Sequence, residues 1–344
     1  MFKNYKFLIF VNFLFILFIL LCYNIYGGDL MNFKSFLKLV EIQTKVASII
    51  PFIIGTLYAL YSYDSFSFLN FLIMFISLEV FDMATTTINN YVDFKSAKKK
   101  EGYGYESHNA IVRDNIPEKL VRLTIAVLLS IAIIFGIILV IRTNLLVLII
   151  GVISFAAGIL YTFGPVPISR TPFGELVSGF IMGFFIIFLA TYIHVYDSKI
   201  ILFNLSKWIL DLSIDLPELL KIFLVSLPAQ LGIANLMLAN NICDIEDDIA
   251  NDRYTLPRYI GKENSVRLYS LIYIKAFLII IILIVFDIVP LITILGLLTF
   301  IPVLSNIHKF RNEQKKDTTF ELAVQNFLII NIALALALLL GVVF

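Results

Sequence analysis

Two segments of the chain share the pattern Asn-Asn-x-x-Asp, and both put amide and carboxylate groups at helical spacing. Residues four apart lie on one face of a helix, so Asn89 aligns with Asp93. Asn240 likewise aligns with Asp244 and, one turn further, with Asp248. The pattern therefore predicts two clusters of oxygen ligands, each at the end of a helix.

The chemistry of these clusters favours a divalent cation. Mg²⁺ prefers oxygen ligands and usually takes one or two carboxylates, with water and substrate phosphates completing its shell. Four acids lie within residues 244–248, and they repel one another unless a cation is present. A single motif of this kind is compatible with a solvated loop, but its recurrence argues against that interpretation. We expect Asn89, Asp93, Asn240, Asp244 and Asp248 to hold Mg²⁺ and, through it, a diphosphate.

A diphosphate also needs basic side chains, since Lys and Arg complement phosphate oxygens. Several cations lie near the motifs: Lys95, Lys98, Lys99 and Lys100 follow the first, Arg253, Arg258 and Lys262 follow the second, Arg170 lies in an inner loop, and Lys45 opens the first span. Among them we take Lys45, Arg170 and Arg253 as candidate diphosphate ligands. Basic residues at a membrane surface are also common topology determinants, so position alone does not separate the two roles.

The elements that carry the motifs must lie in lipid. The chain has 344 residues, of which 60% are hydrophobic and 15% charged, and its mean hydropathy is +0.94. A soluble protein of this length could not bury so much apolar surface. The net charge of +1 gives no basic field for nucleic acid, so a nucleic-acid partner is excluded. Long apolar runs without alternation predict helices instead of a membrane barrel.

We predict an all-α membrane protein, a nine-helix transmembrane bundle, because nine apolar runs approach the length that crosses a bilayer. The expected spans are 46–63, 67–92, 122–141, 144–162, 175–196, 218–243, 268–287, 289–305 and 321–343. The two motifs end the second and the sixth span, which suggests two related halves with a site at their interface. Residues 31–344 are expected to form one polytopic domain.

Residues 1–30 form a hydrophobic extension before this domain. An apolar run at 7–22 follows Lys3 and Lys6, but no small-residue cleavage site follows it. Two interpretations stay open: the run is an extra N-terminal helix that serves as an anchor, or translation begins at Met31.

The distribution of Lys and Arg predicts the orientation of the bundle. If the segment before the first span is cytoplasmic, the inner loops carry nineteen Lys and Arg residues and the outer loops three. Basic residues concentrate on the cytoplasmic side of membrane proteins. We therefore expect a multi-pass protein of the cell membrane with both Asp motifs on the cytoplasmic side.

Paired Mg²⁺ sites at the mouth of an apolar bundle fit a lipid diphosphate substrate. The head group would lie at the acidic clusters and the tail among apolar side chains. Bound metal would stabilise the leaving diphosphate, and an apolar pocket would exclude water from an allylic cation. Aromatic faces stabilise such a cation, and Tyr91 and Tyr161 are candidates for this role.

The motifs resemble those of the UbiA superfamily of intramembrane prenyltransferases. Residues 89–93 are similar to its first aspartate-rich motif, and residues 241–262 are similar to its second. The second motif, together with residues 161–167 and 174–175, most resembles the branch that prenylates 1,4-dihydroxy-2-naphthoate in menaquinone biosynthesis. Three departures are visible. Asn90 stands where many members have Asp, and the acid that usually follows Asp93 by four or six residues is replaced by Ala97 and Lys99, with Glu101 as a possible substitute. The Arg-Thr-x-x-Arg-Pro stretch of other branches is also absent, and this third departure favours the naphthoate branch.

This resemblance implies a UbiA-like fold and a Mg²⁺-dependent transferase of alkyl groups. The implied reaction moves a polyprenyl group from its diphosphate to an aromatic acceptor. In the naphthoate branch the acceptor also loses carbon dioxide and becomes demethylmenaquinone. The resemblance also implies that Asp93, Asp244 and Asp248 are catalytic, and that the implied partners are polyprenyl diphosphate, a dihydroxynaphthoate-like acceptor and the bilayer.

Other classes of function remain as alternatives. A UbiA-type enzyme could act on another aromatic ring. A multi-helix transporter also has repeated halves and polar breaks in its helices, but its ionisable groups should lie near the middle of the bilayer. In this chain the acids of the two motifs lie at helix ends, which favours an enzyme.

Overall fold

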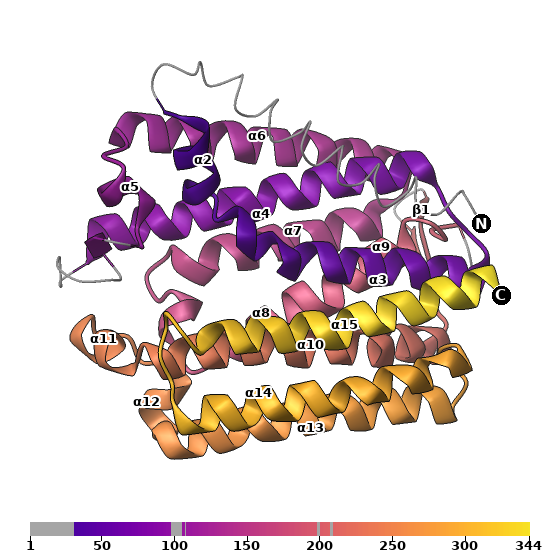
Figure 1. The fold of residues 1–344 in the computed structure, drawn as a ribbon. Helices are drawn as coiled ribbons and strands as arrows, with labels where there is room; N and C mark the ends of the chain where they lie inside the picture. The colour runs from indigo at the N-terminus through magenta and orange to yellow at the C-terminus, as the bar shows by residue number, and fades with distance from the viewer. Residues whose placement is uncertain (1–30, 98–104, 107, 198–199, 207–208) are drawn as a thin grey trace.

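The computed structural model describes residues 31–97, 105–106, 108–197, 200–206 and 209–344. The extension 1–30, for which two interpretations were open, lies outside the described residues. Within the described part, nine helical segments are long and apolar enough to cross a membrane, and the predicted fold class is confirmed. Figure 1 shows them as a bundle of nearly parallel rods.

The membrane-spanning segments follow the predicted order closely. Their bounds are α3 (Val46–Tyr63), α4 (Phe68–Ser96), α6 (Glu118–Arg142), α7 (Leu145–Thr162), α8 (Gly174–Ser178) with η4 (Gly179–Phe185) and α9 (Ile186–Tyr192), α10 (Leu216–Cys243), α13 (Lys262–Val285), η5 (Leu291–Thr299) with α14 (Phe300–Asn312), and α15 (Phe320–Val343). Several extend beyond the predicted apolar runs. For example, α13 starts six residues before the predicted 268, because its charged first turns extend the helix past the apolar core.

Short elements connect these spans. They are α2 (Phe33–Leu39), η1 (Ile42–Lys45), α5 (Ala110–Arg113), η3 (Ile168–Arg170), α11 (Ile245–Ala250) and α12 (Leu256–Ile260). The connection between α9 and α10 contains an antiparallel hairpin of β1 (Ile201–Ser206) and β2 (Ile209–Ile214), with Ile201 opposite Ile214. In Figure 1 this hairpin lies at the end of the bundle opposite α11 and α12.

The two motif-bearing helices each have their own apolar surroundings. One buried cluster surrounds α4 and includes Phe36, Val80 and Leu128. Another surrounds the end of α10 and includes Leu238 and Tyr273. A third, larger cluster joins the two sides through α3, α9 and α15. The helix α4 and the end of α10 therefore have separate apolar surroundings, and α3, α9 and α15 connect the two sides of the bundle.

The outer surface of the bundle is apolar. Large side chains on α6, η5 and α14 are widely exposed, for example Ile141 at 78% and Ile301 at 71%. In water such a surface would favour association with other apolar surfaces. In a bilayer it faces hydrocarbon, because lipid tails are as apolar as these side chains.

The π-helical segment η4 packs against α10 through two glycines. A Cβ added at Gly183 would lie 2.5 Å from the Cα of Gln230, and one at Gly179 would lie 2.6 Å from its carbonyl oxygen. Glycine therefore permits a backbone-to-backbone approach that a larger residue would prevent.

The substitution Gly183→Val is expected to lower the free energy of unfolding by roughly 1–3 kcal/mol, because the helix backbones must separate. The measurement is the midpoint of thermal aggregation in detergent. The control is Gly151→Val, since no atom lies within 4 Å of a Cβ placed at Gly151. Equal midpoints for the two variants would contradict this packing argument.

Candidate active site

Both motifs line one cavity of about 1260 Å³. Asn89 and Asp93 come from α4, while Asn240 and Asp244 come from the end of α10. Asp248, on the short helix α11, lines the same space. In Figure 1 the ends of α4 and α10 lie at the same end of the bundle, near α11 and α12. The structure thus brings together the five residues predicted to hold metal.

An ion pair connects the two motifs across the cavity. The guanidinium of Arg253, in the loop after α11, donates a hydrogen bond to the carboxylate of Asp93. Both side chains remain partly exposed, with Asp93 at 46% and Arg253 at 30%. A cation from the second half therefore already faces an acid from the first, within reach of a shared anionic ligand.

The second motif has a cation that the sequence analysis did not select. The ammonium of Lys316 lies 2.5 Å from the carboxylate of Asp244 and also donates to the amide oxygen of Asn240. Lys316 lines the cavity. The sequence places it among four inner basic residues before the last span, and nothing in the local pattern distinguishes it from the other three.

Asp248 is the most buried acid of the second motif. It is 4% exposed and accepts a hydrogen bond of 2.8 Å from the hydroxyl of Thr255. Burial raises the pKa of Asp248 to about 6, although the hydrogen bond from Thr255 and the charge of Arg253 act in the opposite direction. A carboxylate in this position is stabilised by a nearby positive charge.

Arg170 also lies at the cavity, as predicted. Its guanidinium donates to the hydroxyl of Ser96 at 3.0 Å, and its carbonyl oxygen accepts a hydrogen bond of 2.9 Å from the backbone N–H of Tyr254. The loop that carries Arg170 is therefore fastened both to the end of α4 and to the loop that carries Arg253. These contacts hold Arg170 and Arg253 at the same polar end of the cavity.

The second Asn of each motif supports the structure around the site. The amide of Asn90 donates to the carbonyl of Leu39 and to the carboxylate of Glu41, at 3.0 and 3.2 Å. The amide of Asn241 donates to Glu175 at 2.9 Å. The side chain of Asn90 thereby fastens the segment before α3 to α4.

Lys45 does not lie where the sequence analysis expected. Its side chain is 1% exposed and forms an ion pair of 2.7 Å with Asp82, and it is not among the residues that line the cavity. We therefore remove Lys45 from the set of diphosphate ligands. The reason is the packing of α3 on α4, which offers Lys45 a carboxylate inside the bundle.

The two tyrosines considered for stabilising a cation lie in different places. Tyr161 lines the cavity. The hydroxyl of Tyr91 donates to Glu118 at 2.8 Å, and Tyr91 is not among the lining residues. Only Tyr161 keeps the predicted position for stabilising a cationic intermediate.

Beyond the polar mouth, the cavity wall is apolar. It includes Met74, Phe81 and Phe155, of which the two phenylalanines stack with ring centroids 3.8 Å apart. The lining continues to Ile137 and Val152, which are 51% and 58% exposed at the lipid-facing surface. The cavity therefore leads from charged groups to side chains that face hydrocarbon.

The oxygen ligands at this cavity suit a Mg²⁺ ion whose remaining coordination positions are filled by substrate. Among the residues that the structure describes, no group of three or more His, Cys, Asp or Glu side chains could hold a metal by itself. Each motif instead offers one or two carboxylates with an Asn amide oxygen, all at a shared cavity. Mg²⁺ commonly binds in this way, with waters and phosphate oxygens as its remaining ligands.

Comparison with known proteins identifies the family. The sequence model of the UbiA prenyltransferase family matches residues 48–333. The chain belongs to this family. As a UbiA-family protein it is a multi-pass membrane prenyltransferase, and its nine membrane-capable helices agree with that assignment.

A curated relative shares the branch that the sequence resembles. The chain is 31% identical over 245 residues to the 1,4-dihydroxy-2-naphthoate octaprenyltransferase of Bacillus subtilis, a match that covers 70% of each protein. The resemblance to the naphthoate branch is thus confirmed as a similarity of sequence.

Solved structures of UbiA homologues share the fold. The homologue from Aeropyrum pernix matches with a TM-score of 0.64 at 17% identity, covering 85% of this chain and 97% of that one. The homologue from Archaeoglobus fulgidus, solved with GPP and Mg²⁺, matches with a TM-score of 0.60 at 11% identity, covering 90% and 100%. At these identities the likeness establishes the fold alone.

Proposed function

We propose that this UbiA-family protein transfers a polyprenyl group from polyprenyl diphosphate to 1,4-dihydroxy-2-naphthoate, with loss of carbon dioxide, in a Mg²⁺-dependent reaction. One observation carries the proposal: both acidic motifs and three cations line a single cavity whose far wall is apolar and reaches the lipid. Such a cavity has complementary surfaces for both the head and the tail of a lipid diphosphate.

The diphosphate would lie between the two motifs. Asp93 of one half and Asp244 and Asp248 of the other would hold Mg²⁺, with Asn89 and Asn240 as neutral oxygen ligands. When bound, Mg²⁺ would act as a Lewis acid that stabilises charge on the leaving diphosphate. Arg170, Arg253 and Lys316 would contact the phosphate oxygens directly. In this chain Arg253 and Lys316 are held by the acids of the motifs, so both are already at the cavity.

The apolar wall would bind the prenyl chain and exclude water. Exclusion of water protects an allylic cation from hydrolysis while its bond to oxygen breaks. The face of Tyr161 would stabilise that cation. The exposed lining residues on α6 and α7 provide an exit through which a long tail would extend into the bilayer.

The proposed acceptor is the one in the name of the curated relative, 1,4-dihydroxy-2-naphthoate. The 31% identity to that relative over 245 residues supports the same acceptor here. We also propose that residues 31–344 act as one catalytic domain in the cell membrane. The excess of Lys and Arg in the loops at the motif end supports a cytoplasmic position for the active site.

The test is an assay of the full-length protein in lipid vesicles. Labelled polyprenyl diphosphates are incubated with a panel of aromatic acids, and the products are identified by mass. We expect Mg²⁺-dependent release of diphosphate and a prenylated naphthoquinol that has lost carbon dioxide. Detection of a different prenylated aromatic product would change the proposed acceptor but keep the reaction class. Uptake of intact diphosphate without bond cleavage would instead identify a transporter.

The apolar end of the cavity should control the length of the prenyl chain. Gly151 lines the cavity on α7, and the space around a Cβ placed there is open. The substitution Gly151→Phe is expected to shift the preferred donor to a shorter prenyl diphosphate, because the ring would occupy space used by the tail. Relative kcat/KM for donors of increasing length measures this effect.

The matched control for chain length is Ile141→Phe, at a position that is 78% exposed and outside the cavity lining. It adds an aromatic ring to the same lipid-facing surface without entering the cavity. If both variants keep the wild-type preference, the tail does not pass Gly151.

A further inference from the structure

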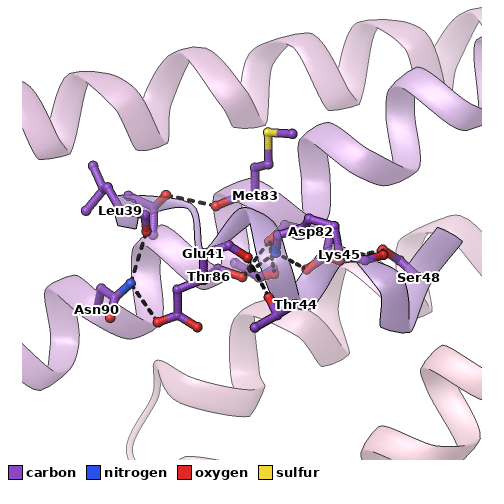
Figure 2. A network of polar contacts seen from close by, with 11 residues as sticks. Leu39, Glu41, Thr44, Lys45, Ser48, Asp82, Met83, Thr86 and Asn90 are labelled. Carbon is purple, nitrogen blue, oxygen red and sulfur yellow. Dashed lines mark hydrogen bonds and ion pairs between the residues drawn. The ribbon is translucent and has the colours of Figure 1, made fainter. Parts of the chain in front are cut away.

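A polar cluster lies inside the bundle, deeper than the motifs, and Figure 2 shows its contacts. The ammonium of Lys45 lies 2.7 Å from the carboxylate of Asp82 and donates to the hydroxyl of Thr86 at 2.7 Å. The hydroxyl of Ser48 donates to the other carboxylate oxygen of Asp82 at 2.6 Å. Both oxygens of Asp82 are therefore held in a fixed orientation by groups on α3 and η1.

A second acid accompanies this pair. Glu79, one turn before Asp82 on α4, is 0% exposed, and neither of its carboxylate oxygens has a hydrogen-bond partner in the described structure. Its polar neighbours are Asp82, Lys45 and Ser48. If both acids are ionised, a single lysine leaves the cluster with one uncompensated negative charge. Such a charge is costly inside a membrane protein, and acids at this depth mark functional sites.

The cluster opens to the substrate cavity. Asp82 is 15% exposed, and together with Ser48 and Thr86 it lines the same space as the two Asn-Asn-x-x-Asp motifs. Asp82 precedes Asn89 by seven residues on one helix, which corresponds to about 10 Å along the axis. An aromatic ring bound beside the reacting end of the prenyl diphosphate could therefore reach Asp82 with a substituent.

The second half of the bundle lacks this cluster. When the two motifs are aligned, the position of Asp82 corresponds to Ile233 and that of Glu79 to Gln230. Ile233 and Met237 line the cavity from α10. At this depth one wall is acidic and the other apolar, so the two halves share the motif but not the deeper acids. This asymmetry fits a flat aromatic ring with a hydroxyl group on one edge.

We propose that Asp82 binds a ring hydroxyl of the aromatic acceptor and accepts its proton during prenyl transfer. This inference rests on the proposed function. A bond forms between the ring carbon that carries the carboxylate and C1 of the prenyl group, while the C1–O bond breaks and the diphosphate leaves with its electron pair. The hydroxyl proton passes to Asp82, and the ring oxygen becomes a carbonyl. Loss of the ring carboxylate as carbon dioxide returns an electron pair to the ring, and Asp82 gives its proton back to the oxygen.

The charges of the cluster balance when it binds one proton. A proton on Asp82 or Glu79 balances the single charge of Lys45 and makes the cluster neutral. Lys45 and Ser48 keep the Asp82 carboxylate pointed in one direction, which fixes the geometry of proton transfer. This gives the buried Lys45 a positioning role in place of the predicted contact with diphosphate.

The test compares Asp82→Asn with the wild-type enzyme in vesicles, using two acceptors that differ in the acidity of the ring hydroxyl. For the less acidic acceptor we expect kcat to fall about 100-fold or more, which is typical for loss of a general base. The loss should be clearly smaller for a fluorinated acceptor whose hydroxyl is already ionised. The Kd of Mg²⁺–polyprenyl diphosphate, measured separately, should not change.

A milder variant covers the case in which Asp82→Asn does not fold. Ser48→Ala leaves the ion pair intact and removes one hydrogen bond to the carboxylate, so kcat should fall about tenfold with the same dependence on acceptor acidity. The control is Thr56→Ala, which removes a buried hydroxyl from the same helix outside the cavity lining.

The outcomes separate the two hypotheses. An equal loss with both acceptors, a loss of diphosphate binding, or wild-type kcat in the Asp82 and Ser48 variants would overturn the role of Asp82 while the prenyl transfer activity stands. Failure of the wild-type protein to transfer prenyl groups to any acceptor would overturn the proposed function and this inference with it.

Discussion

Replacing Asp93 or Asp244 by Asn is expected to lower kcat for prenyl transfer about 1000-fold, while the protein stays inserted and folded. Each substitution removes one anionic ligand and keeps the size of the side chain. The lost stabilisation of the leaving diphosphate amounts to several kcal/mol, and each 1.4 kcal/mol corresponds to a factor of ten in rate. Steady-state rates in vesicles, with saturating Mg²⁺ and acceptor, measure the effect.

The control for these variants is Asp197→Asn. Asp197 is exposed and follows α9 at the opposite end of the bundle from the motifs. It should retain the wild-type rate. Full activity in both the Asp93 and the Asp244 variant would refute their assignment as metal ligands.

Replacing Arg253 by Gln should lower kcat/KM for polyprenyl diphosphate about 100-fold. The guanidinium faces Asp93 across the cavity, and we expect it to bind the phosphate oxygens once metal engages the acids. Arg253→Lys should recover only part of the activity, since Lys keeps the charge but loses the planar fork that binds two oxygens at once. The dependence of the initial rate on the concentration of polyprenyl diphosphate gives kcat/KM for both variants.

A cation elsewhere at the same end of the protein provides the comparison. Arg311, in the last turn of α14, is exposed and lies outside the cavity lining. Arg311→Gln removes the same charge from that region. If Arg311→Gln lowered kcat/KM for polyprenyl diphosphate as much as Arg253→Gln, the effect would come from the positive electrostatic potential of this end of the protein. It would then not come from a direct contact of Arg253 with the diphosphate.

Local sequence patterns predicted the parts of the site that depend on one helix. Helical spacing placed Asn89 beside Asp93, and the repeated motif indicated which two helix ends would meet. Apolar runs predicted all nine spans, because a bilayer requires long uninterrupted segments. The ends of helices were less well predicted, since charged turns extend them beyond the apolar core.

Contacts between distant segments could not be predicted in this way. The sequence alone leaves Lys45 available for diphosphate, whereas the packing of α3 on α4 pairs it with Asp82. Lys316 lies 72 positions from Asp244 in the sequence, and only the connection before α15 brings it to the motif. Glu79 and Asp82 lie within one apolar run, where the pattern gives a membrane span but not the cavity that Asp82 faces.

The central claim is that the two motifs together hold a divalent metal on a diphosphate. The most direct measurement replaces Mg²⁺ by Mn²⁺, adds a non-hydrolysable polyprenyl thiodiphosphate, and records the coupling between bound Mn²⁺ and phosphorus by electron–nuclear double resonance. We predict a strong phosphorus coupling in the wild-type protein that disappears in both Asp93→Asn and Asp244→Asn. An unchanged coupling in these two variants would contradict the account, because the metal would then bind the diphosphate without the motifs.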